Sequence, residues 1–281
     1  MVSIFNQQDF AIVVGTDDPD QILTWGAQSE VLGREGNDHI SGGQRFPISS
    51  GRGQFGGPTF LFGEGGDDDL FLQSGGFADG GPGNDFLMAD GVDATLSGGQ
   101  GNDQLVGADF TFIGQPAPRN LIDGGDGDDT LGGGSSTDRA FGGAGGDTVN
   151  GRGGSDYLDG GADDDRVFGG DGADTVLGDT GNDTLFAGSG SDYLVGGDGD
   201  DMFVFDGAFQ SSLIIDFAPG SGPSGHDAIQ FNGGVFTSFD DLMAHAVQSA
   251  TNVIITDASG DTLTLANVLK TSLVADDFRF A

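Results

Sequence analysis

Apolar residues recur every nine positions between residues 124 and 204, where nine consecutive nonapeptides run without an insertion. Most of them fit the pattern G-G-x-G-x-D-x-U-x, in which U is a large apolar residue, and residues 142–150 (GGAGGDTVN) are a full copy. The first six positions predict a glycine-rich turn, since glycine adopts backbone angles that a β-carbon forbids, and the last three predict a strand. A period this short and regular indicates a stack of small identical units.

The apolar eighth residue of each unit predicts the interior of this stack. We expect two nonapeptides to form one 18-residue coil of an all-β, right-handed parallel β-roll, with successive strands about 4.8 Å apart. No helix is predicted to cover these strands, so the two sheets must cover each other. The predicted core residues are Val149, Leu158, Val167, Val176, Leu185, Leu194 and Phe203.

The period extends upstream with a regular defect. Good copies begin at Gly15, Gly33, Gly63, Gly80 and Gly98, and the segments between them keep an apolar residue but lose the motif. This alternation predicts that one edge of the roll carries acidic turns throughout, while the other carries them only from about residue 133. Two insertions, 42–62 and 107–123, fall on that second edge.

After residue 204 the period stops, which predicts a small mixed α/β cap over residues 205–281 that seals the end of the roll. Residues 211–217, 227–231, 252–256 and 261–265 are predicted strands. Ser238 is the predicted N-cap of a helix, with Asp241 at the capping-box position. The predicted organisation is a capping segment over 1–14, an irregular roll over 15–123, a regular roll over 124–204, and this cap.

Composition adds a constraint on how such a chain can fold. It has 45 acidic and 9 basic residues, a formal charge of −36, and yet 36% hydrophobic residues and 23 Phe. Cations that neutralise the carboxylates would reconcile this charge with a packed core. The acidity excludes nucleic acid as a partner. There is no Cys, no apolar run of transmembrane length, and no signal-peptide pattern in residues 1–10.

The aspartate at the sixth position predicts a hard divalent cation, because Ca²⁺ takes six to eight oxygen ligands with flexible geometry. Mg²⁺ demands octahedral geometry, and Cu²⁺ or Zn²⁺ would favour nitrogen or sulfur ligands. We expect on the order of ten Ca²⁺ ions, one between each pair of successive turns. Asp138 is a weaker candidate, because Ser136 replaces a glycine of its turn. The predicted ligands are Asp20, Asp38, Asp68, Asp85, Asp103, Asp129, Asp147, Asp156, Asp165, Asp174, Asp183, Asp192 and Asp201.

With this repeat the chain resembles the RTX proteins, which carry haemolysin-type calcium-binding repeats. The segments IIDF, GHDAIQF, DTLTLANV and ADDFRF resemble the serralysin-like C-terminal segment of that family, which implies an uncleaved signal for a type I ABC exporter. The resemblance also implies that carbonyls of the second and fourth repeat positions complete each site. Asp163 departs from the family pattern at a fourth position and is expected to distort its turn. The implied carbonyl ligands include Gly143, Gly145, Gly170, Gly172, Gly197 and Gly199.

The sequence contains no H-E-x-x-H or G-x-S-x-G motif, and its three His are scattered, so we expect no enzyme. The leading hypothesis is a secreted calcium-binding protein of adhesion, extracellular matrix or surface-layer assembly, acting at the cell surface or in the medium. Phe60, Phe62, Phe71, Phe77 and Phe86 suggest self-association.

The alternative is a polysaccharide-binding or enzyme-accessory module that acts through the insertion edge. Arg and Phe side chains in the two insertions would make the contacts, although both loops could equally be ordinary surface insertions. The residues concerned are Arg45, Arg52, Arg119, Phe46, Phe55, Phe110 and Phe112.

Overall fold

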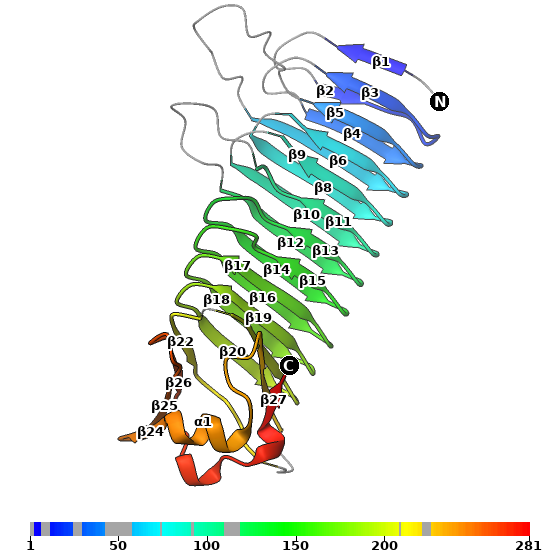
Figure 1. The fold of residues 1–281 in the computed structure, drawn as a ribbon. Coiled ribbons are helices and arrows are strands. Elements are labelled where there is room, and N and C mark those ends of the chain that lie inside the picture. The colour runs from blue at the N-terminus through cyan, green and yellow to red at the C-terminus, as the bar shows by residue number, and fades with distance from the viewer. Residues whose placement is uncertain are drawn as a thin grey trace, which may run out of the picture. The chain divides into compact units, whose positions relative to one another are not determined.

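The computed structural model describes residues 3–6, 12–24, 30–42, 58–73, 75–90, 93–109, 119–207, 209–220 and 226–281. These residues belong to two compact units, Met1–Gly142 and Gly143–Ala281, and each unit is described by itself. Short strands make up nearly all of the regular structure in both (Figure 1). Most of the two insertions lies outside the described residues, including Arg45, Arg52 and the four Phe side chains predicted to accompany them.

The first unit consists of two parallel sheets, and the chain alternates between them. Each strand pairs in parallel with the next strand of its own sheet. Sheet 1 contains β1 (Ser3–Asn6), β3 (Gln21–Thr24), β5 (His39–Gly42), β7 (Asp69–Leu72), β9 (Phe86–Ala89), β11 (Gln104–Val106) and β13 (Thr130–Gly132). Sheet 2 contains β2 (Ile12–Val14), β4 (Glu30–Glu35), β6 (Thr59–Gly65), β8 (Gly76–Pro82), β10 (Ala94–Gln100) and β12 (Leu121–Asp126).

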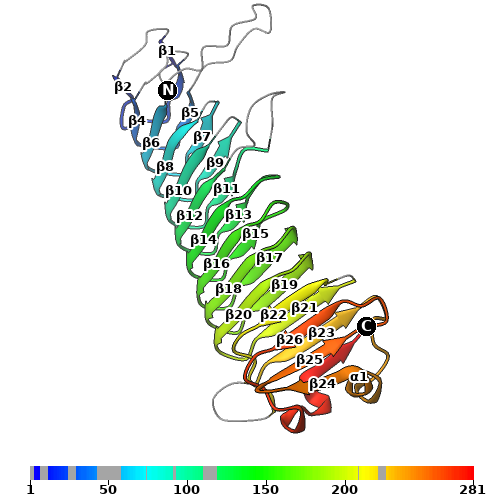
Figure 2. The same ribbon diagram turned by 90° about the vertical axis from the view of Figure 1, so that its left-hand side faces the viewer.

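The second unit follows the same plan (Figure 2), and β14 (Arg139–Ala144) joins the two units in sequence. Sheet 1 contains β15 (Thr148–Asn150), β17 (Arg166–Asp171), β19 (Thr184–Ser189), β21 (Met202–Asp206), β23 (Ala228–Asn232) and β27 (Phe278–Phe280). Sheet 2 contains β16 (Tyr157–Ala162), β18 (Thr175–Thr180), β20 (Tyr193–Asp198) and β22 (Ser211–Ile214), and then three strands of the cap. The predicted parallel β-roll is therefore the observed fold class.

The strands of the repeats are longer than the three residues predicted. Strand β17 continues through the first three positions of the next nonapeptide, and most other strands of the regular repeats do the same. The reason lies in the stacking register. Gly170 pairs with Gly188 and Asp171 pairs with Ser189, so these glycine positions still exchange ladder hydrogen bonds with the next coil. The turn itself is accordingly short.

The core lies between the two sheets and is formed by the eighth residue of each nonapeptide. Equivalent residues stack on one another, as Val167 does beside Leu185. Burial alternates along the strands, which is the pattern expected when one face of a sheet is packed. The predicted core is confirmed, since the exposed fraction is 0% for Val149, Leu158, Val167, Val176, Leu185, Leu194 and Phe203.

The cap contains one helix, α1 (Phe239–His245), and an antiparallel meander of β24 (Ala246–Ser249), β25 (Asn252–Thr256) and β26 (Thr262–Leu265). Two short 3₁₀ segments, Lys270–Ser272 and Ala275–Asp277, precede β27. Ser238 caps α1 as predicted, accepting from the Asp241 amide at 3.2 Å. The capping-box prediction was wrong in one respect. The Asp241 carboxylate accepts from the Thr237 amide at 3.0 Å, one residue before the N-cap, instead of from Ser238.

Candidate metal-binding turns

The structure places each predicted aspartate at the end of a turn, directly before a strand. Turns that lead from sheet 2 to sheet 1 form the first edge, and turns that lead from sheet 1 to sheet 2 form the second edge. The first edge carries Asp20, Asp38, Asp68, Asp85, Asp103 and Asp129 in the first unit, and Asp147, Asp165, Asp183 and Asp201 in the second. The second edge carries Asp138 in the first unit and Asp156, Asp174 and Asp192 in the second. This is the asymmetry that the sequence predicts.

One carboxylate oxygen of most inner aspartates links successive coils. The Oδ1 atom accepts a hydrogen bond from the backbone amide of the aspartate in the preceding coil of the same edge, so the aspartates form a ladder. On the second edge, the Asp156 amide donates to Asp174 at 2.8 Å and the Asp174 amide donates to Asp192 at 3.0 Å. On the first edge, the donor–acceptor distances run from 2.6 to 3.1 Å. Hydrogen bonds to an ionised acceptor are among the stronger ones in proteins.

The other carboxylate oxygen, Oδ2, is buried in most of these turns and has no hydrogen-bond partner. A buried carboxylate without compensation costs several kcal/mol, so each such oxygen requires a positively charged neighbour or a proton. The oxygens without a partner belong to Asp38, Asp68, Asp85, Asp103, Asp165, Asp174, Asp183, Asp192 and Asp201, whose residues are at most 3% exposed.

Burial raises the pKa of these carboxyls far above the ordinary value of 3.8, and the negative charge of neighbouring aspartates raises it further in most of them. The pKa reaches about 8 for Asp68 and Asp165. It reaches about 7 for Asp103 and Asp201, and about 6 for Asp38, Asp85, Asp183 and Asp192. Without a cation, part of this ladder would therefore hold protons at neutral pH.

The backbone of these turns is shaped to present carbonyl oxygens. In twelve turns, nine on the first edge and three on the second, the second and fourth positions both have positive φ. The six predicted carbonyl ligands are among them, with φ of 116° at Gly143 and 146° at Gly172. A β-carbon at Gly190 would collide with the carbonyl oxygen of Gly172 in the preceding coil, so the space between these carbonyls is one that only glycine leaves open.

Five of these strained positions are not glycine. Arg34, Glu64, Arg152 and Asp179 occupy the second position, with φ between 70° and 80°. Asp163 occupies the fourth position of its turn with φ of 79°. The expected distortion at Asp163 is therefore absent, because the residue adopts the glycine-like conformation at a cost of roughly 1–2 kcal/mol. The turn geometry is therefore kept even where a residue other than glycine must adopt positive φ.

A second ladder, which the sequence reading missed, runs along the outside of the first edge. The fifth residue of each turn is Asn or Asp in most coils, and its side-chain oxygen accepts from the amide of the fifth residue in the next coil. The Asn102 amide donates to Asn84 at 2.8 Å, and the Asp200 amide donates to Asn182 at 3.0 Å. The sequence signal was available, because Asn or Asp precedes most aspartates of the first edge.

Asp227 is a further ladder member that the sequence reading missed. Its Oδ1 accepts from the Asp201 amide at 3.1 Å, and Ile229, two residues later, pairs with the core residue Phe203. The motif is unrecognisable there because the preceding segment is longer and its glycines no longer stand at the nonapeptide spacing. On the second edge, Ser212 takes the equivalent place, and its hydroxyl accepts from the Asp192 amide at 3.2 Å.

These features fit a hard cation held mainly by backbone. Among the described residues, no three His, Cys, Asp or Glu side chains converge. A cation at such a turn would therefore combine aspartate Oδ2 atoms with carbonyl oxygens of the second and fourth positions. That donor set consists only of oxygen and includes negative charge, which is the set that Ca²⁺ prefers.

The three His residues lie beside carboxylates, away from the inner ladder. The ring of His39 is 3.5 Å from Asp69, that of His226 is 3.3 Å from Asp277, and that of His245 is 3.6 Å from Asp241. Only the His226 partner is fully buried.

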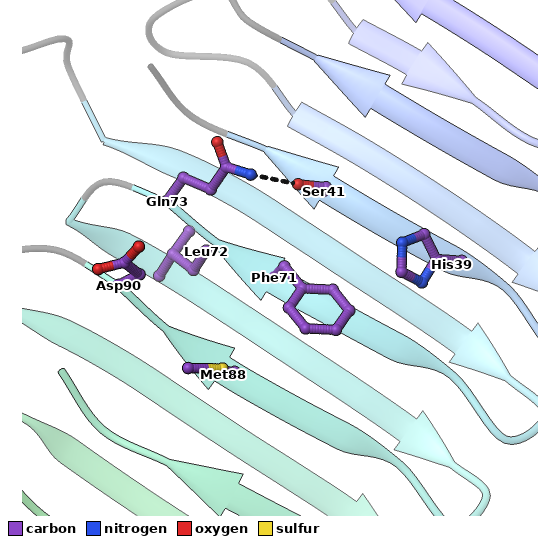
Figure 3. Close-up of a pocket in the computed structure, with 7 residues that line it drawn as sticks. All are labelled: His39, Ser41, Phe71, Leu72, Gln73, Met88 and Asp90. Carbon is purple, nitrogen blue, oxygen red and sulfur yellow. Dashed lines mark hydrogen bonds between the residues drawn. The ribbon is translucent and has the colours of Figure 1, made fainter. Parts of the chain in front are cut away.

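A shallow hollow lies on the outer face of sheet 1 in the first unit, at the ends of β5, β7 and β9 (Figure 3). His39, Phe71 and Met88 line it, and Gln73 donates to the Ser41 hydroxyl at 2.8 Å. It adjoins the point where the chain leaves β5 for the first insertion. Of the three arginines predicted for the insertions, Arg119 alone is described, and its amide donates to Asp93 at 3.0 Å.

Comparisons with known proteins found a repeat family and solved structures to which this chain is similar. The profile of the RTX calcium-binding nonapeptide repeat matches residues 30–44, 79–110, 119–140, 132–167, 141–176 and 168–203. The solved AlgE6R3 subunit of the Azotobacter vinelandii mannuronan C5-epimerase is 26% identical over 52% of this chain and 80% of that chain, with a TM-score of 0.35. The extracellular lipase LipA of Serratia marcescens is 16% identical over 90% of this chain and 45% of that chain, with a TM-score of 0.23. No curated protein matches the chain significantly.

Proposed function

The nonapeptide repeats of this chain belong to the RTX calcium-binding family, and from that premise we propose that calcium binding drives the folding of this protein outside the cell. The observation that supports the proposal is the row of buried Oδ2 oxygens without a partner. A native state of ordinary stability, about 5–15 kcal/mol, cannot carry nine uncompensated carboxylates at several kcal/mol each. Cations at these turns remove that cost.

The aspartates of the twelve positive-φ turns would hold the Ca²⁺ ions through Oδ2, together with carbonyls such as those of Gly170 and Gly172. Calcium would supply positive charge and coordination positions for six to eight oxygen ligands. The chain supplies the rest. Its Oδ1 ladder fixes each carboxylate, its positive-φ residues turn the carbonyls, and its eighth-position residues exclude water from the inner side.

We further propose secretion by a type I ABC exporter, in which the acidic chain crosses unfolded and folds in extracellular calcium. A chain of charge −36 repels itself until cations bind, which suits transport in an unfolded state. Among the described residues, no helix has the length and apolarity needed to cross a bilayer.

The role proposed for the folded roll is non-enzymatic, in adhesion, extracellular matrix or surface-layer assembly. The exposed Phe60, and Phe77 and Phe62 with ring centroids 5.6 Å apart, form an aromatic strip on sheet 2 that supports self-association. Sedimentation of the calcium-loaded protein over a range of concentrations tests this role, and a monomer at all of them would count against it.

A second candidate function is polysaccharide binding in the first unit. The hollow beside the first insertion favours it, because His39 and Phe71 offer ring faces and Ser41, Gln73 and Asp90 offer hydrogen-bonding groups. A glycan array with wild-type protein and Phe71→Ala tests it. Binding that Phe71→Ala abolishes would support the site, and equal signals from both proteins would remove it.

Far-UV circular dichroism tests the primary proposal. The purified chain, transferred from urea into buffer at pH 7.5, is expected to show β structure with 5 mM Ca²⁺, a concentration of the order at which extracellular modules bind. With chelator instead, it is expected to remain largely unfolded. Equal β signals in both buffers would overturn the proposal.

A further inference from the structure

Two aspartates of the ladder sit in turns of a different shape. The turn that ends at Asp20 has Thr16 and Asp18 at its second and fourth positions, and the turn that ends at Asp138 has Gly134 and Ser136 there. None of these four residues has positive φ. The carbonyl arrangement found in the other twelve turns is therefore absent from both.

In these turns the protein itself satisfies the second carboxylate oxygen. The Thr16 amide donates to Asp20 Oδ2 at 2.7 Å, and the Thr16 hydroxyl does so at 3.0 Å. The Gly134 amide donates to Asp138 Oδ2 at 2.6 Å. Both donors are the second residue of their turn. A negative φ at that residue thus directs its amide at the oxygen that is left without a partner in turns such as that of Asp174.

Asp227 shows the same arrangement at the cap end of the second unit. Its Oδ2 accepts from the Ala218 amide at 2.7 Å, while its Oδ1 accepts from Asp201. Asp227 thus has a protein donor on each oxygen. It lies, like Asp20, in the outermost acidic turn of the first edge described in its unit.

We propose that Asp20, Asp138 and Asp227 are positions of the Oδ1 ladder that bind no cation. At each of them a peptide N–H takes the place that calcium takes in the other turns. This inference rests on the proposed function and limits the number of turns that bind calcium. The three residues keep the Oδ1 ladder intact and end the row of ions. They thereby remove Asp20 from the calcium ligands expected from the motif.

Electrostatics supports this division. The amide nitrogen lies 2.6–2.7 Å from Oδ2, so its hydrogen, which carries partial positive charge, repels a cation and occupies a lone pair of that oxygen. A carboxylate has further lone pairs, but Ca²⁺ needs six to eight oxygens, and the turns of Asp20 and Asp138 lack the two positive-φ residues that the other twelve turns share. Charge alone would therefore not recruit an ion.

The neighbouring coil reinforces the division at Asp138. On the second edge of the first unit, the ladder position in the preceding coil is Asn120, whose amide side chain is neutral. The Asn120 Nδ2 donates to Asp138 Oδ1 at 2.9 Å and to the Ala108 carbonyl at 3.2 Å, and Asn120 Oδ1 accepts from the Ala108 amide at 3.1 Å. The Asn120 side chain therefore bridges the coils with hydrogen bonds where two facing carboxylates would need a cation.

Calcium counting by native mass spectrometry tests the inference on the full chain at saturating Ca²⁺. Asp20→Asn, Asp138→Asn and Asp227→Asn are expected to bind the wild-type number of ions. The matched variants Asp174→Asn, on the second edge, and Asp183→Asn, on the first, are expected to bind at least one ion fewer. Loss of an ion from a folded Asp138→Asn protein would overturn the inference.

A calcium-bound crystal structure of the wild type provides a test that no folding defect can obscure. Anomalous scattering would locate ions beside Asp174 and Asp183, and none within about 2.6 Å of Oδ2 in Asp20, Asp138 or Asp227. An ion at any of the last three overturns this inference and leaves the proposed function standing. A wild type that binds no calcium at all overturns the proposed function instead.

Discussion

At the scale of the residue, one dihedral angle decides what a turn can do. A positive φ at the second position leaves the aspartate Oδ2 without a protein donor, as in the turns of Asp174 and Asp192, whereas a negative φ at Gly134 supplies one to Asp138. Four different residue types accept the positive φ, so the requirement comes from the stack and not from glycine alone. The stacked turn is kept despite a local strain of roughly 1–2 kcal/mol.

Substituting a fourth-position glycine tests this requirement. Gly172→Ala is expected to lower the free energy of unfolding by about 2 kcal/mol or more, because φ is 146° and the new β-carbon would collide with the Gly154 carbonyl. Gly153→Ala is the control, since its β-carbon would lie 3.7 Å from the nearest atom, the Asp171 carbonyl oxygen. Urea unfolding in saturating Ca²⁺ measures both, and equal losses would contradict the explanation.

At the scale of the element, most turns of the first edge are held from two sides. The inner aspartate accepts from the preceding coil, and the outer Asn or Asp accepts from the next coil. The two ladders thus run in opposite directions through the same stack. The second edge has Ser155, Ala173 and Ser191 at the outer position, where the Ala173 amide reaches Ser155 only at 3.4 Å. The first edge is therefore the better connected one.

Removing one outer side chain should cost stability without costing an ion. Asn182 accepts from the Asp200 amide and donates to Asp164, both at 3.0 Å. Asn182→Ala is expected to lower the free energy of unfolding by about 1 kcal/mol, the usual contribution of such hydrogen bonds. Ser155→Ala on the second edge should change it far less. Native mass spectrometry should count the wild-type number of Ca²⁺ ions in both, and a lost ion would contradict a purely structural ladder.

The sequence predicts most of this architecture, because one nine-residue period locates both the buried apolar residue and the aspartate of each unit. Val167 and Asp165 follow from the same count. The period cannot show Asp227, since a lengthened turn breaks the count while three-dimensional stacking restores the position. Nor can it distinguish Asp20 from Asp38, because the distinction lies in the backbone direction at the second residue. The repeat pattern also places the strand ends too early. The pairing of Gly170 with Gly188 extends the strands into positions that the glycines had assigned to the turn.

At the scale of the whole molecule, the acidic composition and the packed core depend on each other. A charge of −36 opposes compaction, yet the eighth-position residues of the regular repeats, such as Val167 and Leu185, are 0% exposed. The buried aspartates link these facts, because they bring negative charge into the stack where only a cation or a proton can balance it. Folding of the described roll is therefore linked to calcium and to pH.

The pH dependence of the calcium-free chain follows from the raised pKa values. A carboxyl whose pKa is raised in the folded state favours folding below its unfolded pKa of about 3.8, and this contribution is lost as pH rises through the folded value. The folded values of about 6 for Asp183 and about 8 for Asp165 set that window. With chelator present, β structure measured by circular dichroism should increase as pH falls from 8 to 4. A decrease would contradict the assignment.

Hydrogen exchange with and without calcium tests the central claim most directly. Amides of peptides from residues 30–42, 75–90 and 139–206 would be followed by mass spectrometry at pH 7.5. We expect strong protection of these repeats in Ca²⁺ and near-complete exchange within seconds in chelator, because the buried carboxylates would then be uncompensated. Equal protection in both conditions would show that the roll is stable without cations, and would contradict the account.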